Sequence, residues 1–243
     1  MMTHVYQLDD ISVVDVTDTE DLLIAHKLVG NAYAELSSQA LNPTAVENEL
    51  TADRFFERRV TRTLLACVDG RTERPLGTMR VVLGNAGDDP FEFLDLMSPT
   101  DGWENFTEHF SVDRDFEISR IAFAQAALTT SARACQRHLK TLRALTFAAG
   151  RVGQLRFRRT RAWMIASQRV ANAFRRSGLL PAPIAGPTPN WQRHKSLFNQ
   201  FDKYWVTGGP TFYRLRGWES APRPRYPSPA SHHDAYYEEH VRA

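Results

Sequence analysis

The sequence predicts a mixed α/β domain in which a central sheet carries helices on both of its faces. This prediction rests on the order of the expected elements, which is strand, two helices, a run of strands, helix, strand, helix and further strands. No Gly-x-Gly-x-x-Gly follows a strand and no Gly-Lys-Ser phosphate loop occurs, so a doubly wound dinucleotide fold is not expected. The 243 residues suffice for one domain with a full core, which we expect over residues 1–217. A flexible, proline-rich tail is expected over residues 218–243.

Hydrophobic periodicity and capping residues place the individual elements. The first helix is expected to have Thr17 or Asp18 as its cap and acidic residues in its first turn, as the helix dipole favours. The expected elements of the first half are a strand at 11–16, helices at 19–37 and about 45–59, a strand at 63–68, a turn at 69–75 and a strand at 76–83. Those of the second half are an irregular stretch at 84–115, a strand at 116–123, a helix at 132–149 ending at Gly150, a strand at 161–166, a helix from the Ser167 cap to Gly178, and paired strands at 204–206 and 212–215.

Composition is that of a globular protein without a membrane span or a disulfide framework. No apolar run approaches the roughly 20 residues that cross a bilayer, and the first residues lack the pattern of a signal peptide. The two cysteines, Cys67 and Cys135, fall in an apolar strand and in a basic helix. A reducing, cytoplasmic location is therefore expected. No histidine and cysteine spacing resembles a zinc site, so no metal is expected.

Charge is strongly segregated along the chain. The first third is acidic, whereas no Asp or Glu occurs between Glu117 and Asp202, a stretch that holds many arginines. This stretch, basic and free of acidic residues, predicts a positively charged face that binds an anionic partner. The partner could be nucleic acid, a phosphorylated cofactor or an acidic carrier protein. The alternative is that the two halves neutralise each other across the fold. An arginine run near residue 158 is only a weak nucleic-acid signal, and no nucleic-acid-binding motif accompanies it.

Polar residues interrupt two otherwise apolar strands. Glu117, Ser119 and Arg120 lie in one strand and Arg80 lies in another. Buried strands accept charge only where it is paired or used, so these residues predict a polar pocket on the sheet. Glu117 and Ser119 share a strand face, and Arg120 faces the other way unless a bulge intervenes. The alternative is a structural ion pair of Glu117 with Arg80 or Arg120.

These strands carry a family resemblance. Gly77-Thr78-Met79-Arg80-Val81-Val82 and Glu117-Ile118-Ser119-Arg120-Ile121-Ala122-Phe123 resemble two motifs of the acyl-homoserine-lactone synthase (autoinducer synthase) family. That family belongs to the GNAT superfamily, whose fold long-chain N-acyl amino acid synthases share. The resemblance implies a mostly antiparallel central sheet, acyl transfer from a thioester to an amine, and a bulge in the Glu117 strand that opens backbone N–H groups toward the thioester.

The resemblance also implies roles for particular residues. Glu117 would accept the proton of the amine, and burial is expected to raise its pKa toward a useful range. Arg80 would orient a carboxylate, and Ser119 completes the catalytic set. The positions that match the substrate-binding part of the family are Tyr33, Asp53, Glu57, Arg120, Ala122 and Phe123. Near the first helix the arginine and tryptophan that are typical of the family are absent. The identity of the amine substrate therefore stays open.

The donor is expected to be an acyl-phosphopantetheine thioester, with no cofactor bound permanently. The segment after the Glu117 strand lacks the glycine with which acetyl-CoA enzymes of the superfamily cradle pyrophosphate. An acidic acyl carrier protein is therefore the expected partner, with coenzyme A as the alternative carrier. Its candidate docking residues are Arg133, Arg137, Lys140, Arg156, Arg158 and Arg159.

The sequence thus predicts an N-acyltransferase that moves a fatty acyl group to the amine of an amino acid or related metabolite. Two alternatives stay open. One is homoserine-lactone synthesis from S-adenosylmethionine. The other is a catalytically inactive binding protein of the same fold.

Overall fold

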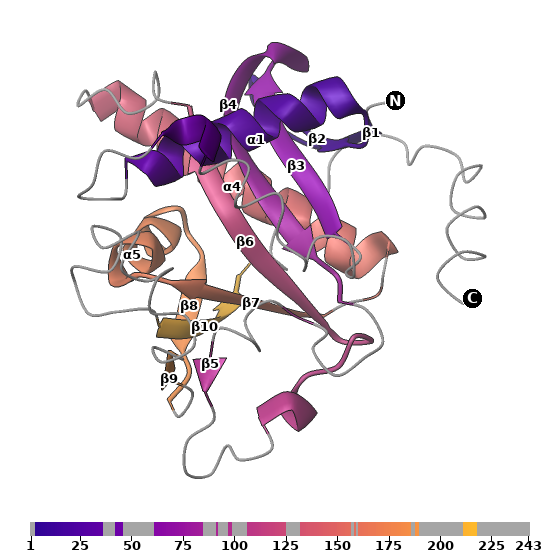
Figure 1. Cartoon of the computed structure of the whole chain (residues 1–243), viewed down its shortest axis with the longest axis vertical. Coiled ribbons are helices and arrows are strands. Elements are labelled where there is room, and N and C mark those ends of the chain that lie inside the picture. The colour runs from indigo at the N-terminus through magenta and orange to yellow at the C-terminus, as the bar shows by residue number, and fades with distance from the viewer. Residues whose placement is uncertain are drawn as a thin grey trace.

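A computed structural model gives the fold of the chain. It describes residues 3–35, 42–45, 61–84, 91, 97–98, 106–124, 132–156, 158, 160–185, 188–189 and 211–217. An eight-stranded sheet in the order β1-β2-β3-β4-β6-β7-β10-β8 dominates it (Figure 1). Its strands are β1 (Thr3–Leu8), β2 (Ile11–Val16), β3 (Thr61–Val68), β4 (Arg71–Val82), β6 (Asp115–Phe123), β7 (Arg161–Ala166), β8 (Leu180–Pro183) and β10 (Thr211–Arg216). The short strands β5 (Met97–Ser98) and β9 (Thr188–Pro189) pair separately.

The large sheet is mostly antiparallel. Each neighbouring pair in it is antiparallel except β6 and β7, which run parallel. The predicted mixed, mostly antiparallel architecture is therefore confirmed.

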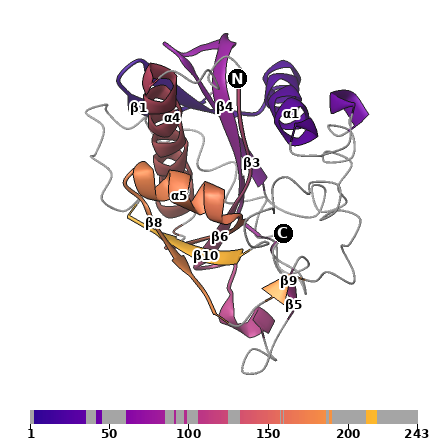
Figure 2. The ribbon, with the colours of Figure 1, turned by 90° about the vertical axis from the view of Figure 1, so that its left-hand side faces the viewer.

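Helices cover both faces of this sheet, as predicted (Figure 2). Helix α1 (Thr19–Ala34) lies on one face, and α4 (Ala132–Arg151) and α5 (Gln168–Arg176) lie on the other. Successive strand residues alternate between the two cores. Val13 packs with residues of α4, for example Leu145, whereas Val14 packs with residues of α1, for example Leu28. We refer to the two sides as the α1 face and the α4 face.

Several local predictions are confirmed because their signals are short-range. The Oδ1 atom of Asp18 accepts the backbone N–H of Asp21 at 3.0 Å, so Asp18 caps α1. The Oγ atom of Ser167 caps α5 in the same way, through the N–H of Val170. Gly178, just after α5, has φ +87°, a conformation that glycine adopts without strain.

Some elements and boundaries were predicted wrongly, among them the end of α1, which stops at Ala34 and not at residue 37. Strand β1 was missed, since its polar residues give little hydrophobic signal at the sheet edge. The turn expected at 69–75 is only Asp69-Gly70, with φ +50° and +75°, and β4 continues through Pro75 at a register shift. Helix α4 does not end at Gly150, and the chain continues as a π-helix over Val152–Arg156.

Close packing explains why a glycine-containing segment does not end the helix here. A Cβ atom at Gly153 would lie 2.8 Å from the ring of Phe116 in β6. The glycine therefore lets the helical segment approach the sheet. Strand β8 was also missed, because its prolines oppose strand structure except at an edge, and β8 is the last strand of the sheet.

Some predictions fall outside the described residues. These are the helix at 45–59 beyond Ala45, the strand at 204–206 and the tail at 218–243. The strand predicted at 212–215 is part of β10, which pairs with β7 and β8.

The described helices include none that has both the length and the apolar character needed to cross a membrane. Within the same part of the chain, no three His, Cys, Asp or Glu side chains gather as a metal site would require.

The two cysteines differ in environment, and this difference makes a prediction. Cys67 is buried in β3, where burial raises the pKa of its thiol from 9.0 to about 11, whereas Cys135 is exposed on α4. Because the thiolate is the reactive form, we expect Ellman's reagent at pH 8 to modify one thiol in the folded protein and two after unfolding in guanidinium chloride. A Cys135→Ser variant should leave no fast-reacting thiol. Rapid modification of Cys67 in the folded variant would contradict the packing described for β3.

Candidate functional site

The polar residues predicted from the sequence meet on the α1 face of three neighbouring strands. Ser119 of β6 lies opposite Arg80 of β4, and Glu117 lies opposite Val82 of β4 and Trp163 of β7. Ile118, between the two polar residues, packs in the α4-side core. Since strand residues alternate between faces, Glu117, Ser119 and Arg80 all project to the α1 face.

These three residues are held in a largely buried environment. The Nε atom of Arg80 donates a hydrogen bond to the Oγ atom of Ser119 at 3.0 Å. Glu117 is only 2% exposed and Arg80 only 6%, whereas Ser119 is partly exposed. Burial makes polar contacts on this face stronger than they would be in water.

A β-bulge follows Ser119. Arg120 and Ile121 together face the single residue Met79 of β4, because Ser119 pairs with Arg80 and Ala122 pairs with Thr78. Arg120 has φ +49°, the left-handed conformation of bulge residues. The extra residue resets the alternation, so Ser119 and Ala122 share the α1 face. The bulge expected in this strand is confirmed.

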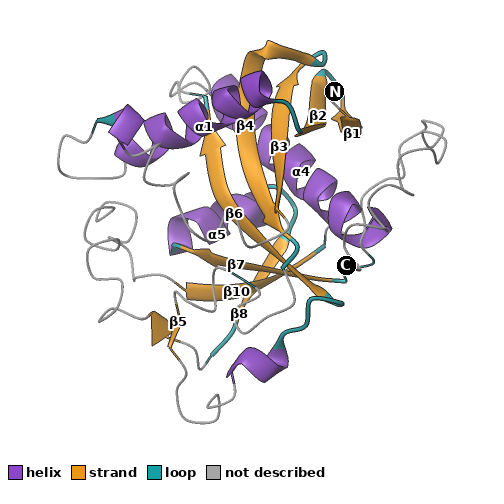
Figure 3. Cartoon of the chain, turned by 45° about the vertical axis from the view of Figure 1, so that its right-hand side comes forward, coloured by secondary structure: helices purple, strands orange, loops and turns teal. Residues whose placement is uncertain are grey.

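Strands β6 and β7 part at Glu117. They pair from Asp115–Arg161 to Glu117–Trp163, and no later pair joins these two strands (Figure 3). The edge of β6 from Ile118 onward therefore lacks β7 as a hydrogen-bonding neighbour. This divergence could not be predicted from the sequence, because it depends on the path of β7 in space. Backbone N–H and C=O groups beside the bulge can therefore form hydrogen bonds with groups other than the backbone of β7.

A buried acidic residue that the sequence pattern does not single out holds the paired ends of these strands together. Asp115 is fully buried and binds Arg161 through two hydrogen bonds of 2.6 Å. It also accepts the indole N–H of Trp163 and, at 2.8 Å, the backbone N–H of Ser111. This network anchors β6 to β7 two residues before Glu117. Its only sequence signal is an acid just before one predicted strand and an arginine that begins another.

The glycine of the first motif has a packing role. A Cβ atom at Gly77 would lie 2.9 Å from both the backbone oxygen of Ala122 and the ring of Phe123. The ring of Phe123 also lies 3.7 Å, between centroids, from that of His138 in α4. Phe123 therefore projects to the α4 face, away from Glu117, whereas Ala122 is buried beneath α1.

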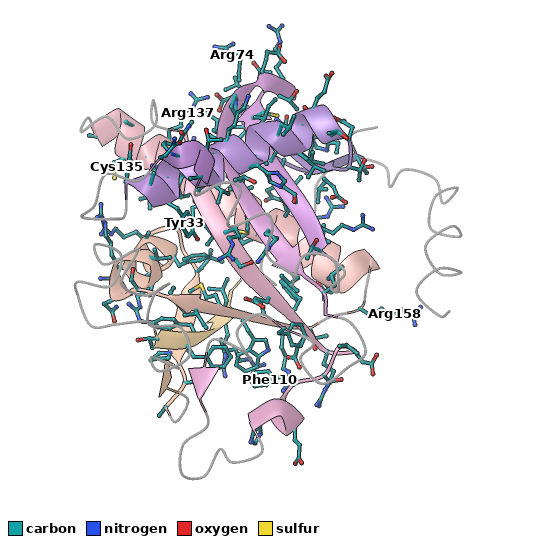
Figure 4. All side chains as sticks on the ribbon, viewed as in Figure 1. Tyr33, Arg74, Phe110, Cys135, Arg137 and Arg158 are labelled. Carbon is teal, nitrogen blue, oxygen red and sulfur yellow. The ribbon has the colours of Figure 1, made fainter. Side chains whose placement is uncertain are left out.

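The other predicted substrate-binding residues are more dispersed. Tyr33 is partly buried near the C-terminal end of α1, where its ring packs against the α1-side core (Figure 4). Arg120 is partly exposed at the bulge. Asp53 and Glu57 lie outside the described residues.

The predicted docking residues whose side chains the structure describes do not form one patch. Arg137 and Lys140 of α4 bind Asp10 and Asp9 of the β1–β2 turn at 2.8 and 2.7 Å, so acidic and basic halves neutralise each other here. Arg158 is exposed beyond the far end of α4, well away from Arg137 (Figure 4). The side chains of Arg133 and Arg156, and all of Arg159, lie outside the described residues.

Comparison with known proteins gives weak likenesses. No protein-family model matches the chain. No curated protein matches it either. Among solved structures it is similar to a GNAT-family acetyltransferase from Bacillus anthracis, with 8% identity, coverage of 90% of this chain and 99% of that one, and a TM-score of 0.46.

Two further structures are similar to the same degree. One is spermidine N-acetyltransferase from Vibrio cholerae, solved with CoA and spermine, with 9% identity, coverage of 86% and 95%, and a TM-score of 0.44. The other is the AHL synthase LasI, with 14% identity, coverage of 84% and 88%, and a TM-score of 0.45. Similarities this low do not assign the chain to a family or an activity.

Proposed function

We propose that this protein is an N-acyltransferase that moves an acyl group from a phosphopantetheine thioester to an amine. The observation that supports this proposal is the position of Glu117, Ser119 and Arg80. They share one face of the sheet at the point where β6 bulges and leaves β7. Acyl transfer needs a base, oxyanion donors and a positioned thioester, and this place offers groups for each.

In the proposed reaction, the nitrogen of the amine attacks the thioester carbon. Glu117 accepts a proton from that nitrogen, directly or through a water molecule. The C–N bond forms, the C–S bond breaks, and the proton is returned to the departing thiolate. Backbone N–H groups at the Arg120 bulge are the candidates to stabilise the oxyanion. Arg80 keeps Ser119 in place through its hydrogen bond and adds positive charge beside the reacting carbonyl.

The donor we favour is a fatty acyl group on an acyl carrier protein, with acyl-CoA as the alternative. The lack of glycine in residues 124–133 supports the carrier protein, as does the basic second half of the chain. The neutralising contacts of Arg137 and Lys140 weaken their candidacy as docking residues. Carrier docking would then depend on other arginines, of which Arg158 is exposed.

Turnover assays test the proposal. The protein is incubated with acyl-CoA and acyl-carrier thioesters of several chain lengths and a panel of amines, and products are identified by mass spectrometry. We expect an amide product together with stoichiometric release of free thiol. Consumption of S-adenosylmethionine would instead indicate lactone synthesis. Salt-sensitive binding of a carrier protein by the folded chain, without turnover for any pair, would indicate an inactive binding protein.

A further inference from the structure

Three arginines lie around Glu117, and two of them have polar partners within the protein. Arg80 donates to Ser119, and Arg161 binds both oxygens of Asp115. The third, Arg214 of β10, is partly buried and lies with its Cζ atom 5.9 Å from the centroid of the Trp163 ring. No hydrogen bond or ion pair joins its guanidinium to any described residue. Among the residues that the structure describes, Arg214 is therefore the arginine of this group whose guanidinium can bind an anion from outside.

The position of Arg214 relates it directly to Glu117. Arg214 lies opposite Trp163, and Trp163 lies opposite Glu117, so the three form one row across β10, β7 and β6. Leu215 packs in the α4-side core, which places Arg214 on the α1 face together with Glu117. Two strand spacings separate their Cα atoms by roughly 10 Å. Two long side chains at this separation can approach the two ends of one small molecule.

We propose that Arg214 binds the carboxylate of the amine acceptor, so that the acceptor is an α-amino acid or another small amino carboxylate. The amine end would lie at Glu117 and the carboxylate end at Arg214, with Trp163 between them. A guanidinium binds a carboxylate through paired hydrogen bonds, and the buried indole beneath it reduces competition from water. This inference rests on the proposed acyl transfer and names the class of its acceptor.

The surrounding charges favour an anionic group at this end of the row. Arg216, two residues along β10, is exposed on the same face. Arg161 is also near the Trp163 ring, at 5.6 Å, but its charge is compensated by Asp115. The row therefore has an acid at one end and, at the other, two arginines that no described residue neutralises, which matches the two charges of an amino acid.

A comparison of acids with amides tests the inference. The twenty standard α-amino acids and their primary amides serve as acceptors for the wild-type chain and for Arg214→Gln and Arg214→Lys variants. Arg169→Gln, which removes an exposed arginine from α5, is the matched control. Loss of a charge-assisted hydrogen bond should raise KM for the acid about 10- to 100-fold in Arg214→Gln and leave KM for the thioester unchanged. Arg214→Lys should restore part of the loss, and Arg169→Gln should match the wild type.

Binding measurements separate this inference from the proposed reaction. Calorimetric titration of the same acids and amides needs no turnover. Carboxylate-selective binding that Arg214→Gln abolishes would support the acceptor site even if no amide forms. Equal use or equal binding of acids and amides by the wild type would overturn it. A rise in KM for the thioester rather than for the amino acid in Arg214→Gln would also overturn it, because Arg214 would then contact the donor.

Discussion

Replacement of Glu117 by glutamine should reduce turnover by about 10²- to 10⁴-fold, the usual contribution of a positioned general base. Glutamine has nearly the same shape as glutamate but cannot accept the amine's proton. Glu117 is 2% exposed, so a substitution of equal shape should leave its packing intact. We therefore expect turnover to fall while the thermal melting temperature changes little. The measurement is single-turnover amide formation by mass spectrometry, alongside a melting curve.

The control for this prediction is Glu73→Gln, the same change at an exposed position of β4. It should affect neither turnover nor stability. If Glu117→Gln instead lowers the melting temperature strongly and its residual folded fraction retains wild-type turnover, Glu117 is a structural partner and not the base.

Replacement of Asp115 by alanine should destabilise the fold by about 3–5 kcal/mol, the range for removing one member of a buried ion pair. The substitution would leave the Arg161 guanidinium and the Trp163 indole N–H without their shared acceptor. Because the network joins β6 to β7, we also expect Glu117 to be less well positioned in the folded fraction of the Asp115→Ala variant. Equilibrium unfolding in urea measures the change in free energy.

Two further variants sharpen this test. Glu108→Ala removes an exposed acid from the segment before β6 and should change stability by no more than about 0.5 kcal/mol. In a double-mutant cycle, Asp115→Ala with Arg161→Ala should cost clearly less than the sum of the single changes, since each residue is the other's partner. Additive costs would show that the two side chains do not stabilise each other.

Much of the fold could be predicted because its signals are local. Capping side chains such as Asp18 and Ser167 indicated where helices begin. An apolar run flanked by polar residues predicted β7 with the bounds that the structure shows. The sequence also placed Glu117 and Ser119 on one face, because strand alternation needs no tertiary information. The bulge at Arg120 came from the family resemblance, since an arginine gives no sign of a positive φ.

The features that the sequence could not reveal depend on contacts between distant segments. Asp115 meets Arg161 and Trp163 only because β6 and β7 run parallel over three residue pairs. Arg137 and Lys140 form ion pairs with Asp10 and Asp9 in the turn between β1 and β2. These particular pairs could not be predicted, because strand β1 was itself not predicted. Gly77 and Gly153 let segments approach closely, and this role depends on their contacts with Phe123 and Phe116, which lie far away in the sequence.

The measurement that tests the central claim most directly is hydrogen–deuterium exchange with an unreactive thioether analogue of the acyl donor, on coenzyme A and on a carrier protein. The claim is that the thioester binds along the edge of β6 where β7 departs, beside Glu117. At saturating analogue, we expect slower amide exchange in peptides covering residues 118–124, with little change in β1 and β2. Saturating binding that leaves residues 118–124 unchanged and protects a different part of the chain would contradict the claim.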